Sequence, residues 1–562
     1  MSDQGRAEPG SRQRARGRTR CGVAAAAAAL LVAACGTAVD APSSSDPSVP
    51  STGTAPATTL LPAPVSPVPP LLDRQAIDAA VAQLDGLAHS AMERTGVPGM
   101  AIAVVYEDEV IYSEGFGVRE VGKPEAVDPE TVFQVASVSK PLASAVVAGV
   151  VGEGVVSWDD PVIDSNPSFA LKDPYVTANA TFADLFSHRS GLYTGSGDLL
   201  EDLGWDRDHI LSRLDQQPLD AFRSSYNYSN FGVTEGGVAA AAAKGMSWED
   251  LAEATLFEPL GMTDSSYRHA DYESRSNKAL IHVEVGEPGS KQWEARYVRD
   301  ADAEAPAGGA SSSVRDLAQF IRAQLGGGTL DGRPIIDPAA LQVTHVPHQE
   351  ISHPTDAAVR TQFYGLGWNV TTDDEGRVRL DHSGAFALGA ATNVAMIPGE
   401  QLGIVTLTNG SPVGVPEAIN NAFFDAAQHG APTVDWLPYY EGLFRQVFGG
   451  EQPGTDYSTP PSDPAPAQGE RAYVGTYANA YYGPLDVTFD GERLSMTMGP
   501  VDRPTTFALT HYDGDTFSFQ TIGENATGLS GAIFTMDGDG TASSVRLEFY
   551  EQTGLGTFTR SS

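Results

Sequence analysis

Two proline-rich stretches limit what this chain of 562 residues can fold into. Residues 36–70 and 449–470 are rich in Pro, Ser, Thr and Ala and show no hydrophobic periodicity. Segments of this composition bury little apolar surface and behave as extended tethers or linkers. They predict a large domain over residues 73–448, a linker over 449–470 and a smaller domain over 471–562.

The first 34 residues have the pattern of an export signal. Five arginines between residues 12 and 20 precede a short apolar run over 22–31, which is too short to span a bilayer. The run ends in Val32-Ala-Ala-Cys35, which resembles the lipobox of bacterial lipoproteins. We therefore expect cleavage after residue 34, lipidation of Cys35 and a disordered tether over 35–72. The protein would then be secreted and lipid-anchored on the extracytoplasmic face of a bacterial membrane; the alternative is an ordinary secretory signal with an incidental cysteine.

Composition excludes some classes of function. The formal net charge is −37, which repels phosphate backbones and argues against nucleic-acid binding. The only two cysteines are Cys21 and Cys35, so the domains have no disulfide and no thiolate nucleophile or metal ligand.

The large domain mixes helical and strand patterns. Residues 73–95 have helical periodicity, and 100–117 read as two strands around a turn at Glu107-Asp108. A helix over 313–325 and strands over 392–397 and 402–408 complete an α+β pattern. Beyond 470, period-two strands separated by Asp-Gly turns predict a small all-β barrel. The segment 537–540 could be a calcium loop, but it lacks the full ligand series, and we interpret it as a turn.

Lysine is rare here, with six lysines against 29 arginines, yet Lys140 follows Ser137 by three residues. At this spacing on a helix the two side chains lie on one face. Serine needs an adjacent base to act as a nucleophile, and a partly buried lysine with a lowered pKa can serve. Arginine could not, because it does not lose its proton. The helix N-terminus would also stabilise an oxyanion.

Two further motifs offer polar side chains. Tyr228 and Asn230 precede an Ala/Gly-rich helix over 233–243 and can project from a loop into a cleft, where Tyr228 would relay a proton. They can equally be a loop aromatic and a capping asparagine. His382-Ser383-Gly384-Ala385 precedes a strand, and Gly384 would let a substrate backbone pass closely. Alone, this motif fits a polar loop.

In this order the three motifs resemble those of the serine β-lactamase and penicillin-binding protein superfamily. The Tyr-x-Asn form is similar to the class C β-lactamase branch, with its D-alanyl-D-alanine carboxypeptidases and family VIII esterases. Further similar stretches are LFSHRSGL (185–192), PAGGASSSVRDLAQF (306–320) and YGLGW (364–368). The resemblance implies an antiparallel sheet flanked by helices, with a helical subdomain, and no metal or organic cofactor.

The resemblance also implies roles for residues. Ser137 would be acylated, Lys140 and Tyr228 would share proton transfers, and Asn230 would hold the lysine and a substrate amide. The backbone N–H groups of Ser137 and Ala385 would form the oxyanion hole, with His382, Ser383 and Gly384 binding substrate.

One departure bears on the substrate. His382 stands where the family's third motif commonly has lysine, and histidine is largely neutral at pH 7. Carboxylate recognition would be weaker, which favours hydrolysis of a small-molecule or peptide substrate, an ester, amide or peptide, over efficient β-lactam destruction. A penicillin- or cell-wall-peptide-binding lipoprotein without turnover is the alternative. We find no Gly-x-Ser-x-Gly elbow of an α/β-hydrolase and no His-Glu-x-x-His zinc motif. Oligomeric state stays open.

Overall fold

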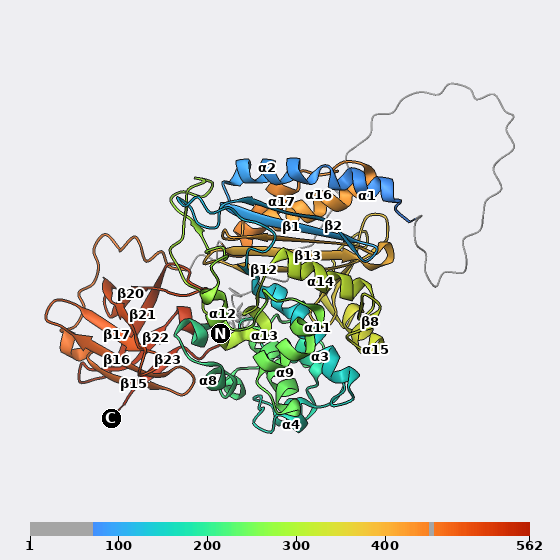
Figure 1. The fold of residues 1–562 in the computed structure, drawn as a ribbon. Helices are drawn as coiled ribbons and strands as arrows, with labels where there is room; N and C mark the ends of the chain where they lie inside the picture. Colours follow the sequence, from blue (N-terminus) through green and yellow to red (C-terminus); the bar gives the residue numbers. More distant parts are fainter. Residues whose placement is uncertain (1–70, 449–453, 562) are drawn as a thin grey trace, which may run out of the picture.

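The computed structural model describes residues 71–448 and 454–561. The predicted signal peptide, Cys35 and nearly all of the tether lie outside the described residues. Figure 1 shows a layered large domain and, beside it, a separate all-β domain. Both predicted fold classes, α+β and all-β, are confirmed.

The large domain is built on one antiparallel sheet of eight strands in the order β2-β1-β14-β13-β12-β11-β10-β9. The strands are β1 (Gly99–Tyr106), β2 (Glu109–Gly117), β9 (Gln349–Ser352), β10 (Gln362–Tyr364), β11 (Asn369–Thr372), β12 (Val378–Phe386), β13 (Ala390–Ile397) and β14 (Leu402–Thr408). The predicted hairpin is present: β1 and β2 pair, and Glu107 and Asp108 both have positive φ, as a tight two-residue turn requires.

Strand β1 is apolar throughout because both faces of the sheet are covered. Met100, Ile102 and Val104 face one core, and Ala101 and Ala103 face the other. The first core lies under four helices, seen above the sheet in Figure 1. They are α1 (Arg74–Val81), α2 (Leu84–Thr95), α16 (Val415–His429) and α17 (Trp436–Phe448). The helical stretch predicted over 73–95 is thus two helices, interrupted at residues 82 and 83.

The opposite face of the sheet carries α14 (Val314–Leu325) and, beyond it, a helical region containing α3 (Ser139–Gly152) and α9 (Asn230–Lys244). Ser313 caps α14 by accepting a hydrogen bond from the Asp316 N–H. The other helices on this side are α4 (Val162–Ser165), α5 (Pro174–Asn179), α6 (Phe182–Phe186), α7 (Asp198–Asp202), α8 (Arg207–Leu211), α10 (Trp248–Ala252), α11 (Glu258–Leu260), α12 (His269–Ser274), α13 (Ala305–Gly308) and α15 (Pro338–Gln342).

Three short strand pairs lie outside the main sheet. They are β3 (Phe133–Gln134) with β6 (Ser311–Ser312), β4 (Val283–Glu284) with β5 (Trp293–Glu294), and β7 (Thr329–Leu330) with β8 (Arg333–Pro334).

The C-terminal domain is a nearly closed barrel in the strand order β18-β17-β16-β15-β23-β22-β21-β20-β19. The edge strands β18 and β19 are separated only by Leu509, so the sheet has curved until its edges meet. Its strands are β15 (Gly475–Asn479), β16 (Gly483–Phe489), β17 (Leu494–Met498), β18 (Thr505–Ala508), β19 (Thr510–Asp513), β20 (Thr516–Gln520), β21 (Leu529–Met536), β22 (Ala542–Leu547) and β23 (Thr557–Arg560). The segment 537–540 closes the β21–β22 turn, with the Gly540 N–H donating to the Asp537 carbonyl.

The two domains are in contact. The Asp202 carboxylate at the end of α7 accepts hydrogen bonds from the backbone N–H groups of Glu524 and Asn525 in the barrel. Within the predicted linker, Tyr457 is buried and its hydroxyl donates to Glu548. The described part of the linker therefore packs on the barrel. Among the described residues, no helix combines the length and hydropathy that crossing a membrane requires.

Candidate active site

Ser137 lies on a single 3-10 turn, η1 (Ala136–Val138), just before α3. The preceding Ala136 has φ +47°, a left-handed conformation that costs energy for a residue with a Cβ. Ala136 is fully buried among Ile281, Phe386 and Ala390, and this packing holds the turn in place. The predicted Ser-x-x-Lys arrangement thus spans the helix start, with Lys140 in the first turn of α3.

Lys140 is fully buried, and its ammonium has three hydrogen-bond partners. Nζ donates to Ser137 Oγ at 3.0 Å, to Asn230 Oδ1 at 2.8 Å and to the Ala307 carbonyl at 3.0 Å. Burial lowers the pKa of Lys140 to about 7, although the carboxylates of Glu304 and Asp198 act in the opposite direction. Near neutral pH, the amine can therefore exist in both protonation states.

Tyr228 packs directly beside this lysine, with the Lys140 Nζ 4.5 Å from the centre of its ring. Its buried hydroxyl has no hydrogen-bond partner among the described residues. Burial raises the pKa of Tyr228 well above that of free tyrosine, and the Ser137 side chain acts in the opposite direction. Tyr228 therefore stays a neutral phenol that can donate a proton.

Asn230 is the first residue of α9 rather than a loop residue. Ser229 is the N-cap, since its Oγ accepts from the Gly232 N–H, so the capping interpretation of Asn230 does not hold. This leaves the Asn230 amide free to accept from Lys140 and to donate to Asp198 Oδ2 at 3.3 Å.

His382 lies within strand β12, not in a loop, and is fully buried. Nδ1 lies 2.8 Å from the Ser383 carbonyl and must donate to it, so Nε2 accepts from the Tyr364 hydroxyl at 2.8 Å. Burial, followed by the charge of Lys140, lowers the pKa of His382 to about 3. The histidine is neutral, and both ring nitrogens are engaged within the protein.

Because side chains alternate between the two faces of the sheet along β12, Ser383 and Ala385 do not face the same side as His382. Ser383 faces the opposite side of the sheet from His382, where its Oγ accepts from Asn393 Nδ2 at 3.0 Å, and the Ala385 side chain packs against the core on that side. Only the backbone of these two residues is therefore oriented to serve the site.

Gly384 is needed for a different contact from the one predicted. A Cβ at this position would lie 2.1 Å from the Val135 carbonyl oxygen, 2.3 Å from Thr392 Oγ1 and 3.1 Å from the Ser137 nitrogen. The space beside Gly384 is therefore occupied by the turn that carries the nucleophile, not by a passing substrate backbone. The close approach brings the backbone of Ser137 next to that of Gly384, the residue before Ala385. An oxyanion hole formed by the N–H groups of Ser137 and Ala385 stays a prediction.

Strand β12 offers an open edge at this point. Its pairing with β11 ends at Asp381, opposite Asn369, whereas its pairing with β13 continues through Phe386. In the described structure, residues 382–386 thus have a strand on one side only, next to Ser137.

Sequence reasoning missed several residues of the site. His188 packs against Tyr228 with ring centres 4.4 Å apart and the ring planes tilted by 37°, and its Nδ1 accepts from the Ser229 N–H. Tyr364 holds His382, and Ala307 supplies a carbonyl to Lys140. All three lie in the stretches 185–192, 364–368 and 306–320. The sequence of these stretches indicated the family but predicted no chemical role for these residues.

Comparison with known proteins places this constellation in a family. A family model described as Beta-lactamase matches residues 84–428, which is more than half of the chain and includes every residue of the Ser137 site named above. The chain belongs to the beta-lactamase family. The expected fold and the predicted superfamily are therefore confirmed, and the larger domain belongs to the beta-lactamase-fold serine hydrolase family. A second model, a domain of unknown function (DUF3471), matches residues 459–557.

Curated relatives of this beta-lactamase-family protein carry several names. Unguisins hydrolase ungD' of Aspergillus campestris is 26% identical over 472 residues, covering 81% of this chain and 86% of that protein. Penicillin-binding protein 4 of Amycolatopsis lactamdurans is 27% identical and covers 68% and 93%. Esterase EstB of Burkholderia gladioli is 30% identical over 220 residues and covers 35% and 54%. These names support a hydrolase but do not define one substrate.

A solved structure shows the same fold. The octameric penicillin-binding protein homologue from Pyrococcus abyssi superposes with a TM-score of 0.54 at 20% identity, covering 85% of this chain and all of that chain.

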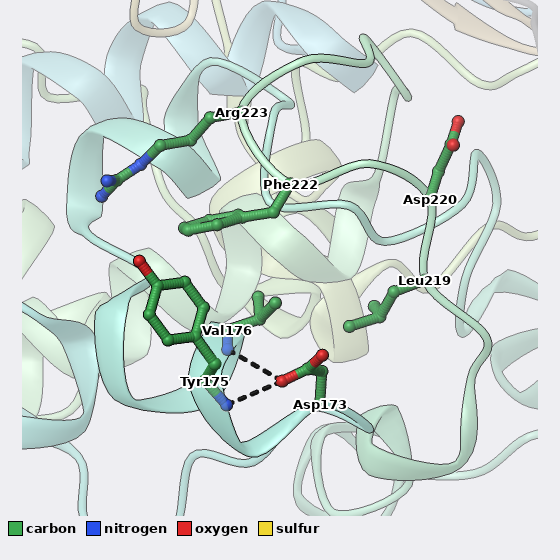
Figure 2. Close-up of a pocket in the computed structure, with 7 residues that line it drawn as sticks. All are labelled: Asp173, Tyr175, Val176, Leu219, Asp220, Phe222 and Arg223. Carbon is green, nitrogen blue, oxygen red and sulfur yellow. Dashed lines mark hydrogen bonds between the residues drawn. The ribbon is translucent and has the colours of Figure 1, made fainter.

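Two other features are separate from the Ser137 constellation. A surface pocket of about 530 Å³ is lined by seven residues, namely Asp173, Tyr175, Val176, Leu219, Asp220, Phe222 and Arg223 (Figure 2). Its Asp173 caps α5 and its Arg223 pairs with Asp184, so these charged groups are already engaged. In the described ranges, one group of ligand-type side chains could approach a metal ion, namely the exposed Asp374, Glu375 and His429.

Proposed function

We propose that this protein is a class C β-lactamase-related hydrolase that cleaves an ester, amide or peptide bond through a Ser137 acyl-enzyme. The observation that carries the proposal is the 3.0 Å contact between Ser137 Oγ and the buried Lys140 Nζ, whose pKa is lowered to about 7. A nucleophile in contact with a base of this pKa is suited to acyl transfer at neutral pH.

The reaction follows from the protonation states of the site. Neutral Lys140 takes the proton of Ser137 Oγ as this oxygen forms a bond to the substrate carbonyl carbon. The backbone N–H groups of Ser137 and Ala385 stabilise the negative charge on the carbonyl oxygen. When the intermediate collapses, the bond to the leaving group breaks and the leaving group takes a proton from Tyr228, which Lys140 reprotonates. Water then attacks the carbonyl carbon of the acyl-enzyme while Lys140 takes one of its protons. The bond to Ser137 Oγ breaks, the acid leaves, and Lys140 returns the proton to Ser137 Oγ.

The third motif bears on the substrate class. His382 is neutral and enclosed, so it provides no cation for a substrate carboxylate. The open edge of β12 can pair with an extended acyl chain, as in strand addition. Both features favour peptide-like or simple ester substrates over β-lactams.

We also propose membrane anchoring through Cys35. The support is the sequence pattern of residues 1–35 alone. Fractionation of cells producing wild type and Cys35→Ala tests it: wild type should sediment with membranes and carry a lipid-sized mass increase, and the variant should do neither.

Intact-protein mass spectrometry tests the hydrolase. Residues 71–562, as wild type and Ser137→Ala, are incubated with a fluorophosphonate, a penicillin and a short-chain nitrophenyl ester. An adduct confined to wild type, together with ester turnover, is expected. A folded sample that gives no adduct with any probe would overturn the proposal and favour the non-turnover binding protein.

A further inference from the structure

Five carboxylates gather around one guanidinium beside the proposed nucleophile. The cation is Arg299, which is buried and donates from Nη2 to both Glu201 and Glu304 at 2.7 Å. The other carboxylates of the cluster are Asp198, Asp202 and Glu524.

The cluster has too little positive charge for its carboxylates. Burial raises the pKa of Asp198 to about 7 and of Glu201 to about 8, because their ionised forms lack solvation. Neighbouring carboxylates raise both pKa values further, and Arg299 acts in the opposite direction. Asp198 is 93% buried, with 7% of its surface exposed, and its Oδ1 has no hydrogen-bond partner among the described residues. Oε1 of the buried Glu201 likewise has none there. Buried polar atoms normally have partners, so these two acceptors point to a missing donor.

The position of the cluster ties it to the reaction centre. Asp198 accepts from Asn230, and the same amide accepts from Lys140, which contacts Ser137. A donor at Asp198 is therefore separated from the nucleophile by only two side chains.

The barrel completes the cluster. The Glu524 carboxylate accepts from the backbone N–H groups of Ala387 and Leu388, in the turn that follows the end of β12 at Phe386. Asp202 in turn holds the backbone of Glu524. The C-terminal domain thus places an acid next to the strand that carries the proposed oxyanion hole.

We propose that the Asp198–Glu201 end of this cluster binds an ammonium group on the acyl part of the substrate. The proposal rests on the acyl-serine function above and names its substrate class: short amino-acyl esters or amides, or peptides with a free amine, near the scissile carbonyl. An ammonium supplies several hydrogen-bond donors and a charge, as the unpartnered oxygens require.

A compact metal ion fits less well. A metal needs ligand atoms that converge on one point, and among the described residues only Asp374, Glu375 and His429 hold such atoms within 4.8 Å of one another. The Arg299 cluster does not meet this condition.

Binding can be measured without turnover. Calorimetry on the Ser137→Ala protein with butylammonium, and with 1-butanol as the uncharged probe, should show saturable binding of the ammonium only. In the Ser137→Ala protein, the second substitution Glu201→Gln should weaken butylammonium binding about tenfold, because one charge-assisted hydrogen bond is lost. Adding Glu235→Gln, at a buried carboxylate on α9 bonded to Asn166, should change nothing. Equal or absent binding of both probes would overturn the proposal.

Kinetics give the second readout. The nitrophenyl esters of 4-aminobutyrate and pentanoate have the same leaving group and similar chains. We expect Glu201→Gln to lower kcat/KM for the amino ester about tenfold and to leave the pentanoate ester within about twofold. A similar fall in kcat/KM for both esters would mean that Glu201 has only a structural role. If neither ester turns over but butylammonium binds, the proposed function fails and the ammonium site stands.

Discussion

The side-chain nitrogen of Lys140 lies 3.0 Å from the hydroxyl oxygen of Ser137, and none of the lysine's surface is exposed. Its position explains why a chain so poor in lysine has one here. Burial destabilises the ammonium, and the amine that results is the base that the serine needs.

Replacing this base should stop turnover. We expect Lys140→Met to lower kcat/KM for a nitrophenyl ester by about 10²–10⁴-fold, the usual contribution of a general base. Lys140→Arg should be equally inactive, because arginine keeps its proton. Circular dichroism and thermal melting check that both variants fold; a folded variant with near-wild-type activity would contradict the role.

Activity should depend on pH through the same group. Because the neutral amine is the active form, kcat/KM should rise as the pH increases through about 7. Glu304 raises the pKa of Lys140, so Glu304→Gln should move the midpoint of this rise to lower pH. The measurement is a pH profile of ester hydrolysis for both proteins; a midpoint that is unchanged or higher in the variant would count against the assignment.

The contact at Gly384 predicts a loss of both stability and activity. In Gly384→Ala the new methyl group would overlap the Val135 carbonyl and Thr392, and we expect unfolding free energy to fall by about 1–3 kcal/mol. Activity should fall as well, because the turn that carries Ser137 must move. Gly86→Ala is the matched control, since a Cβ there meets nothing within 4 Å, and in helix α2 alanine should stabilise slightly. Denaturant titration and ester assays compare the two.

The neutral His382 predicts indifference to a substrate carboxylate. We expect a penicillin and its methyl ester to acylate Ser137 at rates within about threefold, since no cation at position 382 distinguishes them. Time-resolved mass spectrometry measures both rates. A preference of more than about tenfold for the free carboxylate would show that another cation binds it.

Several elements were predictable because their pattern is local. The turn at Glu107-Asp108, strand β14 and helix α14 match their predicted ranges, since alternation, capping and turn chemistry act over a few residues. The Ser-x-x-Lys spacing was equally readable, because three residues always keep two side chains within reach at a helix start.

Other features depend on residues far apart in the chain. The strand setting of His382, the placement of Ser383 on the far side of the sheet and the use of Gly384 by the nucleophile turn follow from the packing of β12 against η1. No local pattern carries that packing, so the motif looked like a loop.

The sequence by itself determined which groups can do chemistry, because residue type and short spacing decide nucleophilicity, charge and local backbone. Tertiary structure alone decided their protonation and surroundings. The lowered pKa of Lys140 and the neutral state of His382 come from burial. The acids around Arg299 come from α7, from the residue just before α13 and from the barrel, so their gathering depends, as burial does, on the whole packed chain.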